Sequence, residues 1–168
     1  NNDFSVDDFF KIPEPLIQKE FSRIMSLKNG LKKMSKSELS DLSRINLTDT
    51  KDEIINKIKK AKTDPLPLPS NIKELEKRPE ARNLIGIYSS LSELTQEETI
   101  KKFAEKNFSE FKENLSQLIV DKIEPISIEI KKLLNEKSYL DKILLEGSKK
   151  ANFQASDKVK KIHEIIGF

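Results

Sequence analysis

The residues best suited to chemistry form one short basic stretch, Lys33-Met34-Ser35-Lys36-Ser37. Two lysine ammonium groups stand three positions apart, with serine hydroxyls between and beside them. Lysine supplies a point charge for phosphate, while hydroxyl and backbone N–H groups supply directional donors. A donor aimed at charge that develops only in a transition state contributes roughly 3 kcal/mol to its stabilisation. The stretch therefore predicts a mobile loop that closes on a phosphate-bearing ligand.

Short extended segments are expected to position this loop. The apolar run Ile24–Leu27 predicts a strand, and the pair Asn29–Gly30 after it is a turn signal. Residues 31–37 are then expected to be a polar, basic loop. Further upstream, Pro13 and Pro15 keep the chain extended. Two short extended segments do not make a stable sheet alone, so this region is not self-sufficient.

From Thr48 onward the sequence predicts helices. Three candidate N-caps, Thr48, Asp49 and Thr50, precede a helix expected over about residues 51–62. One face of this helix is expected to carry three isoleucines, which are Ile54, Ile55 and Ile58. Alternating prolines within residues 64–69 then predict a stiff, extended linker.

Four more helices are expected, over about residues 79–91, 96–107, 108–133 and 139–166. Thr95 with Glu98 predicts a capping box at the start of the second, and Pro125 predicts a kink in the third. The last helix carries a strip of small residues, which are Gly147, Ala151 and Ala155. This strip predicts close packing of another helix, and a contact to RNA backbone is the alternative.

The composition limits the chemistry that the chain can perform. Charged residues make up 35% of it but sum to only +3, so nucleic acid would be bound locally. No cysteine is present, which excludes disulfides and thiolate metal sites. The one histidine, His163, reads as a helix-surface residue, and no metal site is predicted. No apolar run approaches the ~20 residues of a membrane helix, so a soluble, cytoplasmic protein without a membrane partner is expected.

The basic stretch and its flanks resemble a known family. The stretch matches the KMSKS signature of class I aminoacyl-tRNA synthetases. Segments on both sides agree with it, namely Ile12–Ile17, Arg23–Leu27, Ser43–Asp49, Arg78–Leu84, Ile87-Tyr88, Leu145–Ala151 and Ile166–Phe168. Together these segments resemble the tryptophanyl-tRNA synthetases of the bacterial and mitochondrial type, and the resemblance covers nearly the whole chain.

The resemblance implies a reaction and a catalytic pair. Enzymes of that family join ATP and tryptophan into tryptophanyl-adenylate with loss of pyrophosphate, and then transfer the amino acid to tRNA(Trp). Mg²⁺ accompanies ATP in the full-length enzyme. By similarity, Lys36 binds the ATP phosphates and stabilises the leaving pyrophosphate, and Lys33 assists it.

The same resemblance assigns the rest of the ATP site. Ser35 and Ser37 are expected to donate to phosphate or to position the loop. Ile24 matches a position whose backbone lies against the adenine, and Met34 is expected to be a structural pivot.

The resemblance also implies that part of the active site lies elsewhere. The family's other ATP signature holds two histidines in an HIGH-like string, and this chain has only His163. The sequence is therefore expected to be a truncated C-terminal part, with no adenylate-forming activity alone. A mostly α fold is expected: residues 1–45 would end a Rossmann-type catalytic domain, and residues 46–168 would form a helical anticodon-binding domain. The full-length parent is expected to be a homodimer.

Two other hypotheses about the function remain open. The chain could be a stand-alone helical RNA-binding module, or a helical interaction domain whose basic loop is incidental. Clusters of lysines could meet phosphates, at Lys57-Lys59-Lys60, Lys101-Lys102, Lys131-Lys132 and Lys158-Lys160-Lys161. Each cluster is also explained as a solvated helix face, because acidic residues are interleaved with most of them.

Overall fold

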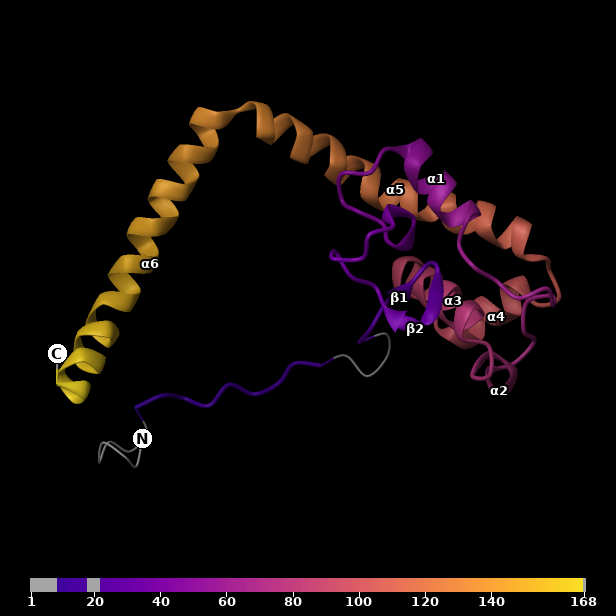
Figure 1. Ribbon diagram of the computed structural model, residues 1–168, viewed down its shortest axis with the longest axis horizontal. Coiled ribbons are helices and arrows are strands. Elements are labelled where there is room, and N and C mark those ends of the chain that lie inside the picture. Colours follow the sequence, from indigo (N-terminus) through magenta and orange to yellow (C-terminus); the bar gives the residue numbers. More distant parts are fainter. Residues whose placement is uncertain (1–8, 18–21, 168) are drawn as a thin grey trace. The chain divides into compact units, whose positions relative to one another are not determined.

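The computed structural model describes residues 9–17 and 22–167, and most of them are helical, as predicted. The chain divides into two compact units. The central unit is Gln18–Lys131, and the terminal unit combines Asn1–Ile17 with Lys132–Phe168. The basic stretch lies in the central unit (Figure 1).

The central unit begins with an antiparallel hairpin. Strand β1 (Met25–Ser26) pairs with β2 (Asn29–Lys33), so that Met25 faces Lys33. The turn lies at residues 27–28, two positions before the predicted one. The expected loop over 31–37 is correspondingly shorter, because residues 31–33 belong to β2.

Gly30 explains why the turn prediction was wrong. A Cβ at this position would lie 2.6 Å from the carbonyl carbon of Pro79 and 2.7 Å from the amide nitrogen of Glu80. Real Cβ atoms do not approach backbone so closely, so β2 packs on the first turn of α3 (Pro79–Ser92) only because residue 30 lacks a side chain. The glycine serves a tertiary contact and not the turn.

Helices complete the central unit. After the 3-10 turn η2 (Asp41–Ser43) come α1 (Lys51–Lys59), α2 (Ile72–Leu75), α3, α4 (Gln96–Phe103) and the first part of α5 (Phe108–Asn135). Thr50 and Thr95 each close a capping box, with Glu53 and Glu98 respectively. Two helices end earlier than predicted. Lys60 caps α1, and the extended backbone of Ala104 stops α4.

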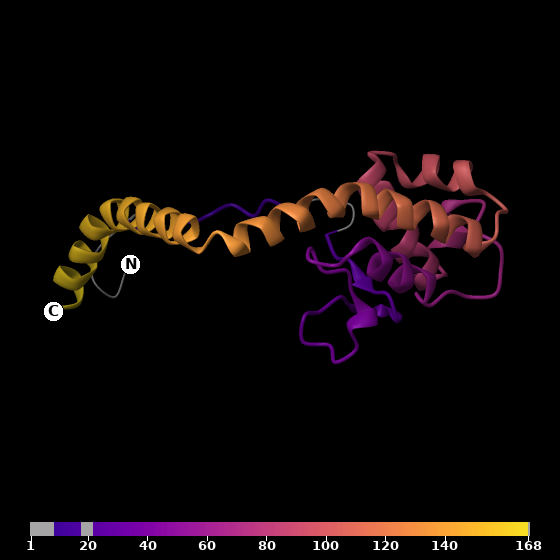
Figure 2. The same ribbon diagram turned by 90° about the horizontal axis from the view of Figure 1, so that it is seen from above.

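One apolar core lies between these helices and the hairpin. Tyr88, Phe103 and Phe111 form its aromatic centre, with ring centroids 4.9–5.8 Å apart. Leu27 brings the hairpin turn into the same core at 2% exposure. In both ribbon views α1 runs beside α5 (Figures 1 and 2). The Lys112 ammonium donates to the carbonyl oxygens of Lys59 and Ala61 and so binds α5 to the end of α1.

The buried face of α1 differs from the predicted row of isoleucines. Ile54 and Ile58 are fully buried, but Ile55 is 36% exposed and the third buried position belongs to Lys57, at 3%. The positions three and four residues after Ile54 share its helix face, which places 57 and 58 beside it, whereas Ile55, the next residue along the chain, is turned to the side. The interpretation of Lys57 as part of a solvated or phosphate-binding lysine cluster is therefore wrong.

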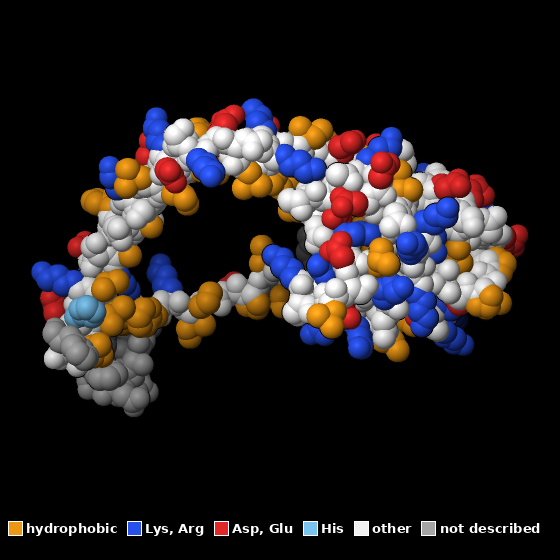
Figure 3. All heavy atoms as spheres, turned by 45° about the horizontal axis from the view of Figure 1, so that its top comes forward, with side chains coloured by type: hydrophobic (Ala, Val, Ile, Leu, Met, Phe, Trp, Pro, Cys, Tyr) orange, Lys and Arg blue, Asp and Glu red, His pale blue; other side chains and the backbone are white. Residues whose placement is uncertain are grey.

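The terminal unit contains the long helix α6 (Lys137–Ile166), which buries none of its residues. Hydrophobic side chains stand exposed along it (Figure 3), with Phe153 at 85% and Leu144 at 70%. Nothing in the described chain lies within 4 Å of a Cβ added at Gly147, so no helix packs on the predicted strip there. His163 is exposed on this helix, as predicted. Helix α5 continues through Pro125, and the break before α6 comes at Glu136.

None of the helices within residues 9–17 and 22–167 combines the length and apolarity needed to cross a membrane.

Candidate functional site

A pocket of about 620 Å³ opens between the hairpin and the segment that follows it. Five of the six residues predicted to bind the nucleotide line it, which are Ile24, Lys33, Met34, Ser35 and Lys36. The remaining lining comes from residues 22–23 and 44–47. Figure 2 shows the segment after β2 projecting outward from the helices, where a ligand can reach it. The structure therefore brings the predicted loop and the predicted adenine-facing position to one cavity.

The loop has a defined local structure. The Met34 amide donates to the Ile24 carbonyl oxygen at 3.0 Å, which joins the start of the loop to the residue directly before β1. The half-buried Met34 side chain packs against the core. Beyond it, Ser35 Oγ accepts from the Ser37 amide at 3.3 Å and lies 2.8 Å from Ser37 Oγ. Ser37 is not among the lining residues, and it acts here as the partner of Ser35.

The charges on the pocket wall are of one sign. Lys33 and Lys36 are joined by Arg23 and Arg44, and the described lining contains no Asp or Glu. Ammonium groups, guanidinium groups and serine hydroxyls suit an anion with several oxygen atoms, such as a phosphate chain. The same lining offers no carboxylate ligand to Mg²⁺, which prefers oxygen ligands of that kind.

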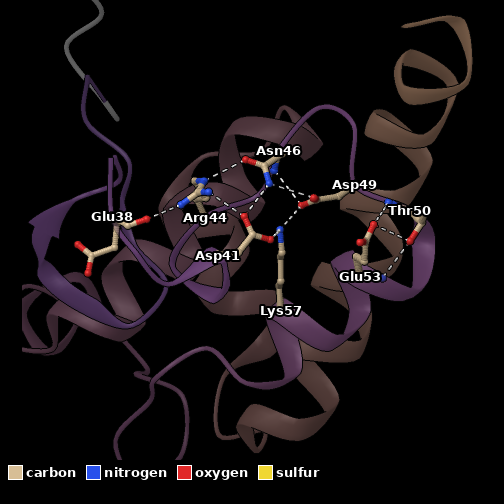
Figure 4. Close-up of polar contacts among 8 residues, drawn as sticks. All are labelled: Glu38, Asp41, Arg44, Asn46, Asp49, Thr50, Glu53 and Lys57. Atoms are coloured by element: carbon tan, nitrogen blue, oxygen red, sulfur yellow. Dashed lines mark hydrogen bonds and ion pairs between the residues drawn. The ribbon is translucent and has the colours of Figure 1, made fainter. Parts of the chain in front are cut away.

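A polar network fixes the far end of the loop (Figure 4). Arg44 donates through Nη1 to the Glu38 carbonyl oxygen at 2.9 Å, and its Nη2 lies 2.8 Å from Asp41 Oδ1. Asn46 receives a hydrogen bond from Arg44 Nε at 3.1 Å and donates to the carboxylates of Asp41 and Asp49. The segment after the loop is thus folded around two carboxylates.

Lys57 connects this network to α1. Its ammonium lies 2.6 Å from Asp41 Oδ2 and 2.7 Å from Asp49 Oδ2, in a position where the lysine side chain is 4% exposed. Burial opposes the charged form, but the hydrogen bonds to both carboxylates and their negative charges together outweigh it and raise the pKa of Lys57. The hydrogen bond from Lys57 is also the largest cause that lowers the pKa of Asp41.

The opposite side of the hairpin is held by one amide side chain. Asn83 of α3 accepts from the Met25 amide and donates to the Met25 carbonyl oxygen, both at 2.8 Å. These two hydrogen bonds take the place of those that a neighbouring strand would make with β1. They also fix the backbone directly after Ile24, which is one of the pocket-lining residues.

Several residues of this site were not assigned a role from the sequence. Arg44 and Asn46 belong to a flank that carries the family resemblance, so that flank was the available signal for them. Lys57 could have been found from its spacing to Ile54, which places it on the buried face of α1. Its partners Asp41 and Asp49 are 16 and 8 residues away, and no local pattern pairs them.

The fold and the pocket describe a mainly helical protein with a cationic loop suited to phosphate. A family model described as "tRNA synthetases class I (W and Y)" matches residues 1–122, and the chain belongs to this family. The resemblance that rests on the KMSKS signature is thereby confirmed at the level of the family.

Curated relatives narrow the comparison to one branch of that family. The chain is 48% identical over 163 residues to a tryptophan–tRNA ligase from Mesorhizobium japonicum, which covers 97% of this chain and 46% of the relative. A tryptophan–tRNA ligase from Rickettsia felis is 49% identical over 161 residues, covering 96% of this chain and 48% of the relative. The chain spans about half the length of the curated relatives it matches, and it corresponds to their C-terminal part.

Solved structures share the fold. Tryptophanyl-tRNA synthetase from Mycoplasma pneumoniae aligns with a TM-score of 0.72 at 22% identity, over 90% of this chain and 45% of that one. The Campylobacter jejuni enzyme, solved in complex with ADP and tryptophan, aligns with a TM-score of 0.67 at 24% identity. This alignment covers 96% of the present chain and 48% of the Campylobacter chain.

Proposed function

We propose that this chain is the C-terminal part of a tryptophan–tRNA ligase, that its loop acts on ATP, and that its helices contact tRNA(Trp). The ligase would join the tryptophan carboxylate to the α-phosphorus of ATP, with cleavage of the α–β phosphoanhydride bond and release of pyrophosphate. Tryptophan would then pass to the terminal adenosine of the tRNA. The chain spans only half of its relatives, so the remaining half would supply the tryptophan pocket and the other ATP signature.

Within this reaction Lys36 and Lys33 are the proposed catalytic pair. Negative charge grows on the β-phosphate oxygens as pyrophosphate leaves, and an ammonium group held in a closed loop stabilises it more than in bulk water. Ser35 and Ser37 would keep the loop in its turn and donate to phosphate, while Ile24 would border the adenine. Met34 would anchor the loop on the core.

The observation that carries the proposal is the convergence of Ile24 and the KMSKS residues on one cationic pocket. The sequence identity of 45–49% to tryptophan–tRNA ligases supports the choice of amino acid and tRNA. The proposal also covers the organisation of the protein. Residues 1–45 would form the end of the catalytic domain, and residues 46–168 would form the anticodon-binding domain. The parent enzyme would be a cytoplasmic homodimer that uses Mg²⁺ with ATP.

Replacement of Lys36 by Met tests the proposal in a full-length ligase that carries this sequence. We expect Lys36→Met to lower kcat for tryptophan-dependent ATP–pyrophosphate exchange by about 100-fold, the typical effect of removing one donor to developing charge. Binding of tRNA(Trp) to the same variant should stay unchanged, because the loop acts on the nucleotide.

The matched control is Lys32→Met, which removes an exposed lysine of β2, four positions before Lys36, that is not among the pocket-lining residues. It should retain full exchange activity. Equal activity of Lys36→Met and Lys32→Met would contradict a catalytic role for the loop.

A further inference from the structure

Lys57 combines two properties that its place in a helix does not explain. The residue is 3% exposed, and its ammonium is held by two carboxylates at 2.6 and 2.7 Å. Its helix, α1, is otherwise anchored by the fully buried Ile54 and Ile58. A third apolar residue would fill the same face without removing a charge from water.

Stability alone does not account for this arrangement. Burying a charged group costs free energy that its ion pairs only partly return, and apolar replacements of buried ion pairs often leave stability equal or higher. Such pairs are retained in some proteins because they specify one arrangement of the chain.

The contacts lead from Lys57 to the catalytic loop in three steps. Lys57 holds Asp41, Asp41 holds the guanidinium of Arg44, and Arg44 donates to the carbonyl oxygen of Glu38, the residue directly after the KMSKS stretch (Figure 4). Glu38 in turn donates from its amide to the Ser35 carbonyl oxygen at 3.4 Å. Asp41 is shared by both cations, so it transmits the position of α1 to the loop.

We propose that Lys57 is a positioning residue of the KMSKS loop, which acts through Asp41 and Arg44 to hold the loop's C-terminal stem against α1. The consequence for catalysis rests on the proposed function, since the loop matters to ATP only if it binds phosphate. The effect on the loop itself does not depend on that function.

Hydrogen exchange in the 168-residue chain tests the positioning directly. Lys57→Met keeps an unbranched, buried side chain but removes both ion pairs. We expect the amides of residues 35–46 to exchange at least about ten-fold faster in this variant, while α3 and α5 keep their protection, because local opening is governed by local contacts. Lys57→Arg keeps the charge and should return much of the protection.

Two further variants provide an independent test and a control. Asp41→Asn breaks the link at a half-exposed carboxylate and leaves Asp49 to neutralise Lys57, so it should loosen the same segment even if Lys57→Met folds poorly. Arg78→Met removes a comparably buried cation whose partners Asp64, Glu74, Leu66 and Pro67 lie away from the loop. Residues 35–46 should keep their exchange rates in this control.

A double-mutant cycle in the full-length ligase gives the catalytic readout. If Lys57 acts through the loop, Lys57→Met should lower kcat for ATP–pyrophosphate exchange in the otherwise unchanged ligase. In the Lys36→Met background the same substitution should lower kcat little further, because the effects of coupled residues are not additive. Independent, additive losses would overturn the inference, and so would unchanged exchange of residues 35–46. Faster amide exchange with no effect of Lys36→Met on activity would support positioning while contradicting the proposed function.

Discussion

Gly30 is the residue at which strand β2 meets the first turn of α3. A methyl group there would have to displace backbone atoms of Pro79 and Glu80, which lie 2.6 and 2.7 Å from its position. Backbone at the start of a helix cannot rotate away as a flexible side chain can. The residue therefore controls how closely the hairpin sits on α3, and with it one wall of the loop pocket.

We expect Gly30→Ala to lower the free energy of unfolding by about 1–3 kcal/mol, the usual range for forcing an extra carbon into a packed contact. Urea denaturation followed by circular dichroism measures the change. Gly147→Ala is the control, because it adds the same methyl group in a helix where, beyond the adjacent turns of the helix itself, no described atom lies within 4 Å of it. It should raise the helicity of α6, since alanine is favoured over glycine by about 1 kcal/mol. Equal effects of the two substitutions would refute a packing role for Gly30.

At the scale of elements, the hairpin depends on helices for its stability. Its two short strands form one ladder, and a two-stranded hairpin is marginal in water. Asn83 supplies both a donor and an acceptor to Met25, which satisfies backbone groups that a third strand would otherwise pair. The amide is 8% exposed, so water does not readily replace it.

Asn83→Leu should therefore lower the free energy of unfolding by about 2 kcal/mol, because it leaves the Met25 amide and carbonyl unpaired in a partly buried place. The exchange of amides 25–33 should rise in the same variant, which mass spectrometry can follow by segment. Ser90→Ala on the same helix changes an exposed polar residue and should alter neither quantity. Unchanged exchange of the hairpin in Asn83→Leu would mean that Gly30 packing alone holds it.

Elements defined by local rules could be predicted from the sequence. The Thr95–Glu98 capping box needs only two side chains three positions apart, and the structure confirms this prediction. Helix α3 starts at Pro79 as predicted, since proline tolerates the first turn. The loop signature was likewise visible as a string of five residues.

The errors came from contacts between distant residues. Asn29–Gly30 looked like a turn, but the glycine is required by Pro79, which lies 49 positions later. Lys57 looked like a surface lysine, since neither Asp41 nor Asp49 marks itself locally as its partner. Ala104 leaves the helical conformation although its side chain favours helix, which shortened α4. Tertiary contacts decided the cases of Gly30 and Lys57.

At the scale of the whole molecule, several ion pairs and caps should make stability depend on acid. Asp64 lies in partly buried surroundings that oppose its charge, yet the hydrogen bonds from Arg78 and the Leu66 amide, together with the charge of Arg78, outweigh burial and lower the pKa of Asp64. The Lys57 hydrogen bond lowers the pKa of Asp41, and backbone hydrogen bonds from Thr50 and Thr95 lower the pKa values of Glu53 and Glu98.

A carboxyl group with a lowered folded pKa binds fewer protons in the folded state than in the unfolded state. Its stabilisation is present above the unfolded pKa of about 4 and is lost as the pH falls through the folded pKa. We therefore expect the urea midpoint to be steady near neutral pH and to fall steeply below about pH 4. Asp64→Asn should flatten part of this fall, because residue 64 no longer titrates. A urea midpoint that stayed constant down to pH 3, roughly one unit below the pKa of the carboxyl groups in the unfolded state, would contradict the lowered pKa values in the folded state.

The absence of buried residues in α6 has a thermodynamic consequence. The heat capacity increment of unfolding and the denaturant m-value both scale with the surface that becomes newly hydrated. A helix of 30 residues that buries no side chain contributes little new surface when it melts. Calorimetry of this chain should therefore give a heat capacity increment per residue below that of ordinary globular domains. The cooperative heat absorption peak would report the melting of the central unit, and α6 would add a broad, sloping baseline from its own helix–coil transition.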